Sequence, residues 1–231
     1  MKIATGVLSV FGMIAFSAAA SAAPFINGDF ETGVAPPAGG FSTLSAGSTD
    51  ITGWLVAGGT QVNGPGSVDY INGYWDDADP VGGSRSVDLN GNGAGGVYQA
   101  FDTVVGQAYS VSFALAGNPD QGSIKDLTAF ANDGAGFPYL GGGLFTFDST
   151  GHTKTGAPGM GWLTYSFAFV ADSVLTTLNF SSLTDSAFGP ALDNVSVSAV
   201  PIPAALPLFA SGLAAFGVFA NRRRRKVSAQ A

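Results

Sequence analysis

The residues that could do chemistry in this chain are mostly carboxylates. Among its 16 acidic residues Glu31 is the only Glu, and the chain has no Cys and a single His, His152. Without Cys, thiol catalysis, disulfides and Cys-ligated zinc or iron–sulfur centres are excluded. His152 stands in a Gly/Thr-rich segment without a nucleophile motif, so we expect a surface residue and not a catalytic base.

One group of oxygen ligands stands at the two ends of the central region. Asn27, Asp29 and Glu31 lie near its start and Asp193 near its end. Calcium takes several oxygens from carboxylates and carbonyls, at about 2.3–2.6 Å. If the first and last strands lie side by side, as is common in a jelly roll, these four residues form a structural calcium site. The alternative is that Glu31 and Asp193 only cap turns or accept backbone hydrogen bonds.

A second group combines aromatic rings with a carboxylate. Tyr70, Tyr74, Trp75 and Asp76 fall in one short segment, with more Asp after it. A flat ring can stack on the apolar side of a sugar, and a carboxylate can accept hydrogen bonds from its hydroxyls. We therefore predict carbohydrate binding here, with the alternative that the rings cover an edge of the sheet. Trp54 is predicted to belong to the core.

Three further patterns match known site motifs in their residue types alone, without the structural context that those sites need. Segment 77–82 with Asp88 is similar to an EF-hand loop, but Val81 occupies a ligand position and no helices flank it, so we expect a surface loop. Segment 91–96 spells G-x-G-x-x-G between two strand-like runs and opens no helix, which favours a tight hairpin over a dinucleotide site. Carboxylate pairs at glycosidase spacing, roughly 5–10 Å, arise easily by chance among so many acids.

Short strands must position these residues. Apolar and polar residues alternate over 108–115 and 163–169, the pattern of half-buried strands. Further short runs cover 86–89, 97–101, 127–131, 144–147, 175–180 and 195–197, with turn residues between them. The bias toward Asp over Glu also disfavours helix. Residues 24–199 are therefore predicted to form one all-β domain, an antiparallel β-sandwich or jelly roll.

Both ends differ from this domain. Residues 1–23 start basic, continue as an apolar run and end in an A-x-A motif, as a cleaved signal peptide does. Residues 202–220 carry no charge and would span roughly 28 Å as a helix, about the thickness of a bilayer core. Five cations follow at 222–226, so we expect a transmembrane helix with a cytoplasmic basic end. Residues 24–200 hold all 16 acids and three basic residues, which argues against nucleic-acid binding.

A Pro-x-Pro motif, an apolar helix and a basic cluster follow one another over residues 200–226. The motif residues are Pro201, Pro203, Arg222, Arg223, Arg224 and Arg225. This arrangement resembles the bacterial PEP-CTERM sorting signal, although Ile202 stands where that family often has Glu. The resemblance implies processing by an exosortase-type enzyme in a Gram-negative bacterium that makes exopolysaccharide. The protein would be anchored transiently in the inner membrane and delivered to the cell envelope or the extracellular matrix.

Several short segments keep a characteristic order across the central domain. They are 27–31 (NGDFE), 51–54 (ITGW), 67–71 (SVDYI), 84–91 (SRSVDLNG), 111–113 (VSF), 115–120 (LAGNPD) and 189–197 (GPALDNVSV). Together they resemble the bacterial choice-of-anchor C domain, which is related to a plant cell-wall family of unknown function with a galactose-binding-like fold. The resemblance implies a jelly-roll sandwich with no established catalytic residues.

These features predict an exported, noncatalytic surface or matrix protein that binds carbohydrate or organises exopolysaccharide. Two alternatives stay open: a structural matrix protein that contacts other proteins, and a polysaccharide-active enzyme. The expected partners are the exosortase-type enzyme, extracellular polysaccharide and, before processing, the membrane. A structural calcium ion is the one cofactor expected.

Overall fold

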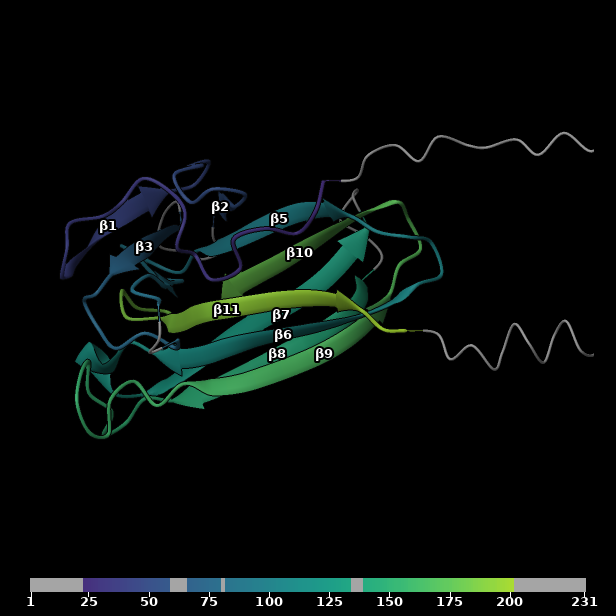
Figure 1. Cartoon of the computed structure of the whole chain (residues 1–231). Helices are drawn as coiled ribbons and strands as arrows, with labels where there is room; N and C mark the ends of the chain where they lie inside the picture. The colour runs from purple at the N-terminus through teal and green to yellow at the C-terminus, as the bar shows by residue number, and fades with distance from the viewer. Residues whose placement is uncertain (1–22, 59–65, 80–81, 134–138, 202–231) are drawn as a thin grey trace, which may run out of the picture.

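The computed structural model describes residues 23–58, 66–79, 82–133 and 139–201. In these ranges the chain forms a six-stranded and a five-stranded sheet that pack face to face, and all strand pairs are antiparallel (Figure 1). The predicted all-β sandwich is therefore confirmed. The elements are β1 (Gly40–Ser45), β2 (Leu55–Ala57), β3 (Ser67–Asn72), β4 (Val87–Asp88), β5 (Gly96–Asp102), β6 (Ala108–Gly117), η1 (Pro119–Gln121), β7 (Ile124–Asp133), β8 (Tyr139–Asp148), β9 (Leu163–Val170), β10 (Leu175–Ser182) and β11 (Pro190–Ala199).

Strands that are distant in sequence lie side by side in both sheets. The order is β1-β3-β4-β11-β6-β9 in the six-stranded sheet and β2-β5-β10-β7-β8 in the five-stranded sheet. The chain therefore crosses between the sheets repeatedly, as in jelly rolls. The Gly-rich segment 91–96 is one such crossing: an antiparallel bridge joins Asn90 to Ala94, but β4 and β5 belong to different sheets. The predicted tight turn is present, since the N–H of Gly95 also donates to the Leu89 carbonyl at 2.8 Å, but the strands on either side of it do not pair with each other.

Aromatic side chains join the two sheets. Phe113 of β6 lies 5.0 Å from Phe145 of β8 and 5.1 Å from Phe180 of β10, measured between ring centroids and with edge-to-face geometry. Trp54 is 2% exposed, which confirms it as a core residue. Burying a side chain of this size contributes about 2–3 kcal/mol, so each of these contacts between the layers stabilises the sandwich.

The first described segment closes one edge of the sandwich. The backbone of Ile26 exchanges two hydrogen bonds with the side chain of Gln99 in β5, and the N–H of Val195 in β11 donates to the carbonyl of Gly28 at 2.8 Å. This segment therefore bridges β5 of one sheet and β11 of the other. The expectation that the first and last strands lie side by side is wrong, because β3 and β4 lie between β1 and β11; it is the segment before β1 that contacts β11.

The described chain begins and ends at the same end of the sandwich (Figure 1). The predicted signal peptide lies outside the described residues except for Ala23, and the predicted transmembrane helix 202–220 and basic cluster 222–226 lie outside them entirely. Pro201 is thus the one residue of the predicted sorting motif that the structure places, two residues after the end of β11 at Ala199. The described residues include no helix with the length and apolar character needed to cross a bilayer.

Candidate functional site

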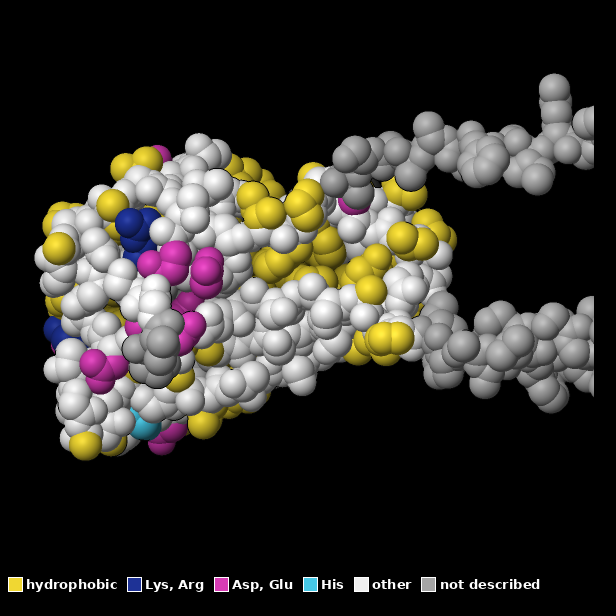
Figure 2. Space-filling model, viewed as in Figure 1, with side chains coloured by type: hydrophobic (Ala, Val, Ile, Leu, Met, Phe, Trp, Pro, Cys, Tyr) yellow, Lys and Arg dark blue, Asp and Glu magenta, His cyan; other side chains and the backbone are white. Residues whose placement is uncertain are grey.

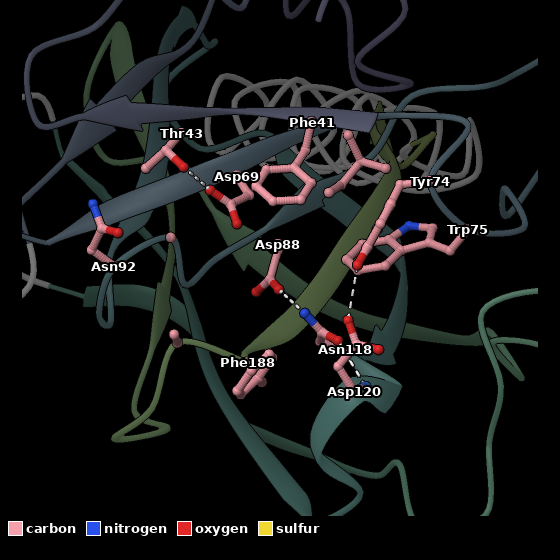
Figure 3. Close-up of a pocket in the computed structure, with 13 residues that line it drawn as sticks. Phe41, Thr43, Asp69, Tyr74, Trp75, Asp88, Asn92, Asn118, Asp120 and Phe188 are labelled. Carbon is pink, nitrogen blue, oxygen red and sulfur yellow. Dashed lines mark hydrogen bonds between the residues drawn. The ribbon is translucent and has the colours of Figure 1, made fainter. Parts of the chain in front are cut away.

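A pocket of about 220 Å³ lies on the outer face of the six-stranded sheet, where β1, β3 and β4 meet two loops (Figure 3). One loop is η1 with Asn118 before it, and the other is segment 187–188, which leads into β11. The lining residues are Phe41, Thr43, Asp69, Ile71, Tyr74, Trp75, Asp88, Gly91, Asn92, Asn118, Asp120, Ala187 and Phe188. The pocket therefore combines aromatic walls with carboxylates and side-chain amides.

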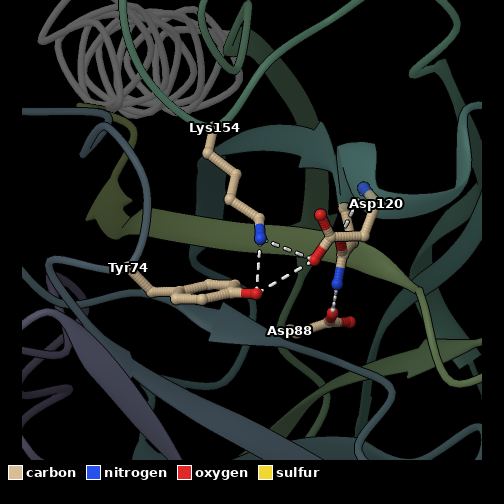
Figure 4. Close-up of polar contacts among 5 residues, drawn as sticks. Tyr74, Asp88, Asp120 and Lys154 are labelled. Carbon is tan, nitrogen blue, oxygen red and sulfur yellow. Dashed lines mark hydrogen bonds and ion pairs between the residues drawn. The ribbon is translucent and has the colours of Figure 1, made fainter.

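A polar triad supports one wall of the pocket: Tyr74 and Asp120 line the wall, and Lys154, which does not line it, contacts both (Figure 4). The Tyr74 hydroxyl donates to the Asp120 carboxylate at 3.0 Å, and the Lys154 ammonium contacts that carboxylate at 2.8 Å and the hydroxyl at 2.5 Å. Burial lowers the pKa of Lys154, but its hydrogen bonds to Asp120 and Tyr74 outweigh this effect and raise the pKa. Lys154 therefore stays charged and fixes the orientation of the Tyr74 ring.

The floor of the pocket is a fully buried carboxylate, Asp88. Its oxygens accept hydrogen bonds from the backbone N–H groups of Asn90 (2.9 Å) and Gly189 (3.0 Å) and from the Asn118 amide (2.8 Å). Burial nevertheless raises the pKa of Asp88 to about 7, and the charge of nearby Asp69 adds to the rise. Asp88 ties β4 to both pocket loops, so its first role is to hold the pocket together.

A buried lysine also supports the loops. Lys125 is 0% exposed, and its ammonium donates to the carbonyls of Gln121 (2.8 Å) and Phe188 (2.7 Å). Burial lowers the pKa of Lys125, while the charge of Asp88 raises it. The two loop carbonyls and the ammonium satisfy one another, which is the usual condition for burying a charge.

The aromatic residues of the pocket differ in exposure. Phe41 is 42% exposed and lies edge-to-face on Tyr74, with ring centroids 5.2 Å apart. Trp75 is 3% exposed and donates its indole N–H to Ser86 at 2.7 Å. The rings that a ligand can reach are therefore those of Phe41 and Tyr74, while Trp75 packs behind them.

Of the four residues predicted to bind carbohydrate, only Tyr74 presents a partly exposed ring to the pocket. Tyr70 is 0% exposed, and its hydroxyl donates to the Phe30 carbonyl at 2.5 Å, so the prediction for Tyr70 is wrong: its ring faces the core. Trp75 lines the pocket but is too buried to stack on a sugar. Asp76 is exposed outside the pocket, and its carboxylate accepts from the N–H of Gly156 at 3.1 Å. Asp76 therefore anchors a neighbouring loop.

Acidic side chains gather on one face of the molecule near the start of β11 (Figure 2). Glu31 accepts from the backbone N–H groups of Ser84 (2.7 Å) and Arg85 (2.6 Å), and Arg85 returns a hydrogen bond to the Glu31 carbonyl at 2.7 Å. This agrees with the alternative reading of Glu31 as an acceptor of backbone hydrogen bonds. Asp29 accepts from the N–H of Glu31 at 3.4 Å and stays at the surface.

Asp193 lies deeper in the same region and faces Asp77, which was not among the predicted calcium ligands. It is 1% exposed and accepts from the N–H of Asn194 (2.6 Å) and, more weakly, of Ala78 (3.3 Å). Burial and the charge of Asp77 raise the pKa of Asp193 strongly, and burial also raises the pKa of Asp77. Asp77 Oδ2 is buried without a hydrogen-bond partner.

The predicted calcium ligands are only partly brought together. The Asn27 amide is occupied by the backbone of Thr32 and Thr52, with distances of 2.7–2.8 Å, so it fixes a turn and is not available to a metal. Within the described ranges no three acidic or His side chains are arranged to hold a metal ion. The acidic pair that the structure does form is Asp77 with Asp193.

Most of the residues that form the pocket were not predicted from the sequence. Phe41, Asp69 and Asp120 line the pocket and Lys154 supports it, but these residues lie on four separate segments and no local motif joins them. One signal was present: Asp88 interrupts an apolar run between Val87 and Leu89, and an Asp at such a position must find buried partners.

Several solved structures are similar to this chain at low identity. A structure described as CBM4 structure and function is 15% identical, with a TM-score of 0.41 over 76% of this chain and 99% of that chain. The TmCBM61 complex with β-1,4-galactotriose is 12% identical, with a TM-score of 0.42 over 64% and 90%. A CBM35 from Paenibacillus barcinonensis is 18% identical, with a TM-score of 0.41 over 69% and 99%.

Two sequence comparisons cover most of the central domain. Halomucin from Haloquadratum walsbyi is 31% identical over 172 residues, which make up 72% of this chain but 2% of halomucin. The chain thus spans a very small part of that relative. The assignments to choice-of-anchor C and PEP-CTERM stay predictions. The family described as "Protein of unknown function (DUF642)" matches residues 23–198. Because this match covers well over half of the chain, the chain belongs to the DUF642 family.

Proposed function

We propose that this protein is a noncatalytic carbohydrate-binding domain and that the pocket beside Tyr74 holds one sugar residue of an extracellular polysaccharide. The observation that carries the proposal is the pairing of two reachable rings, Phe41 and Tyr74, with the carboxylates of Asp69 and Asp120 in one small pocket. A sugar has an apolar face and a rim of hydroxyls, and this pocket offers a complement to each.

The polar groups are held in place before a ligand arrives. Thr43 donates to Asp69 Oδ1 at 2.6 Å, and Lys154 and Tyr74 hold Asp120. Groups that are already ordered lose little conformational freedom on binding, which favours affinity. In the bound state we expect the sugar hydroxyls to donate to the two carboxylates while the Phe41 ring covers the apolar face.

The position of the pocket suits a tethered protein. β11 begins next to the pocket loop 187–188 and ends at Ala199, just before the predicted sorting segment. Ten extended residues span roughly 33 Å. A protein anchored through its C-terminal segment would therefore hold the pocket about one domain length away from the membrane, where polysaccharide is accessible.

We also propose the export route expected from the sequence: removal of the signal peptide near residue 23, transient anchoring in the inner membrane and exosortase-type processing at Pro201–Pro203. Mass spectrometry of the protein from the envelope and the medium of the producing bacterium tests this. The expected product starts at residue 23 or 24 and lacks the basic cluster 222–226. Intact full-length chain in the cytosol would contradict the proposal.

A calcium ion between Asp77 and Asp193 is a further part of the proposal. The Asp77 and Asp193 carboxyl groups share a hydrogen bond, and with both groups ionised the buried Asp77 Oδ2 has no donor; a divalent cation in place of the shared proton would offset the repulsion between the two carboxylates. Calcium should raise the Tm of the wild type over that in chelator, and Asp193→Asn should remove most of this difference. Equal melting of the wild type with calcium and with chelator would rule the ion out.

A glycan array tests the binding function. The purified protein is screened with calcium and with chelator, alongside Phe41→Ala and the control Leu163→Ala, which shortens an exposed side chain on β9 away from the pocket. We expect Leu163→Ala to bind like the wild type and Phe41→Ala to bind about tenfold more weakly, given the usual worth of an aromatic contact. Signals that are identical for all three proteins would contradict the assignment of the pocket.

A further inference from the structure

The outer face of the five-stranded sheet carries a second hollow, separate from the pocket described above. Its volume is about 360 Å³, within the range of roughly 300–1,000 Å³ typical of small-molecule sites. It is lined by β7, β8 and β10, together with Gly58, Gly95 and Leu183. We call this hollow the groove.

Strand register explains which side chains reach the groove. Leu127, Ala129 and Ala131 of β7 are buried in the core, so the alternate residues Thr128 and Phe130 point outward. In the neighbouring strand β10, Ser181 pairs with Thr128 and Asn179 pairs with Phe130. Directly opposed residues share a face of the sheet. Hydroxyl and amide groups therefore surround the Phe130 ring.

A pair of aromatic rings forms one wall. Phe130 and Tyr139 are stacked, with centroids 4.5 Å apart and an interplanar angle of 24°, and Tyr139 is 55% exposed. Phe130 pairs across the strands with Gly142, where a Cβ would lie 2.0 Å from the Ala129 carbonyl oxygen. Glycine is therefore required at this position for the close approach of β7 and β8 beside the Phe130 ring.

The groove also contains an unsatisfied acceptor. Asn132 lines it and is 7% exposed, yet its Oδ1 atom has no hydrogen-bond partner. A buried acceptor without a donor costs about 1–3 kcal/mol, so the site is more stable when a ligand donates a hydrogen bond to it. None of the residues that line the groove is charged, which favours an uncharged ligand with hydroxyl donors and an apolar face.

We propose that the groove is a second carbohydrate site, for an uncharged glycan whose ring stacks on Tyr139 and whose hydroxyl donates to Asn132 Oδ1. Together with the proposed function of the pocket, on which this consequence rests, the domain would hold glycan on both outer faces. A domain with two such faces bridges two polysaccharide chains and strengthens attachment through multivalency.

The test is an NMR titration of the ¹⁵N-labelled protein with uncharged β-1,4-linked hexaoses of glucose, galactose and xylose. We expect at least one hexaose to shift the amide signals of Thr128, Asn132 and Asn179. Tyr139→Ala should weaken this binding about tenfold. The exposed control Leu163→Ala should leave it unchanged, and thermal unfolding of each variant checks that the fold is kept.

The remaining outcomes separate the two sites. Shifts confined to the pocket residues Asn92 and Asp120 would overturn the groove and leave the proposed function standing. Shifts confined to the groove would support the groove and contradict the assignment of the pocket. If none of the three hexaoses shifts the groove amides, or if Tyr139→Ala binds as tightly as the wild type, the groove proposal is wrong.

Discussion

The Asp88→Asn variant should change how the stability of the protein depends on pH. Burial raises the pKa of Asp88 from 3.8 to about 7. Because the folded-state pKa is the higher one, the folded protein binds the extra proton between these values. The stabilisation is therefore complete below about pH 4 and is lost as the pH rises through 7.

The size of the effect follows from the same shift. One pKa unit corresponds to about 1.4 kcal/mol, so Asp88 alone should remove about 3 kcal/mol from the free energy of unfolding between pH 5 and pH 8. Asparagine cannot ionise. Its carbonyl can still accept from the N–H groups of Asn90 and Gly189, but its amide opposes the Asn118 amide, which adds a cost that does not depend on pH.

Urea unfolding followed by Trp fluorescence at several pH values measures this difference. The free energy of unfolding of the wild type minus that of Asp88→Asn should fall by about 3 kcal/mol from pH 5 to pH 8. The raised pKa of Asp193 contributes to both proteins and cancels. Asp172→Asn, at an exposed position between β9 and β10, is the matched control. A wild-type-minus-variant difference that stays constant, or that rises with pH, would refute the reasoning.

Three further substitutions test the packing of the fold and the support of the pocket. Gly28→Ala would place a Cβ 1.8 Å from the Val195 carbonyl oxygen, and we expect the free energy of unfolding to fall by about 2–3 kcal/mol, seen as a lower Tm. In the control Gly143→Ala the new Cβ meets nothing within 4 Å and should cost under about 1 kcal/mol, so equal losses in the two variants would contradict the close approach at Gly28. Lys125→Met leaves two loop carbonyls without their donor and should cost about 2–4 kcal/mol in urea unfolding, whereas an unchanged midpoint would show that the ammonium is dispensable. Glu31→Ala removes the acceptor of two backbone N–H groups and should cost about 2 kcal/mol by calorimetry, and a neutral result would contradict the backbone role of Glu31.

Alternation in the sequence predicted the strands that have one apolar face. In β6 and β9 every second residue is large and apolar, and both strands were expected within a few residues of their bounds. β3 was not predicted from alternation because both of its faces are largely buried, and β2 has only three residues. β1 has a Gly, three hydroxyl residues and little apolar content, so its pairing with β3 depends on the tertiary structure.

The candidate site was predictable only in part, because the pocket is assembled by topology. Tyr74 was found through its aromatic type and its acidic neighbours. Tyr70 was misplaced, since it shares its parity along β3 with Val68 and both point into the core. Asp120 and Phe41 meet Tyr74 only because β1 pairs with β3 and η1 follows β6 on the same sheet. The positions of these residues along the chain do not indicate that they meet in the folded structure.

The binding pocket is tested most directly by calorimetric titration of Asp69→Ala and the wild type with the glycan that the array selects. The Asp69 carboxylate lines the pocket, is held by Thr43 at 2.6 Å, and in the proposed complex accepts a hydrogen bond from a sugar hydroxyl. We expect Kd to rise about tenfold, the usual worth of a hydrogen bond to a charged group. An unchanged Kd for Asp69→Ala would contradict sugar binding in this pocket.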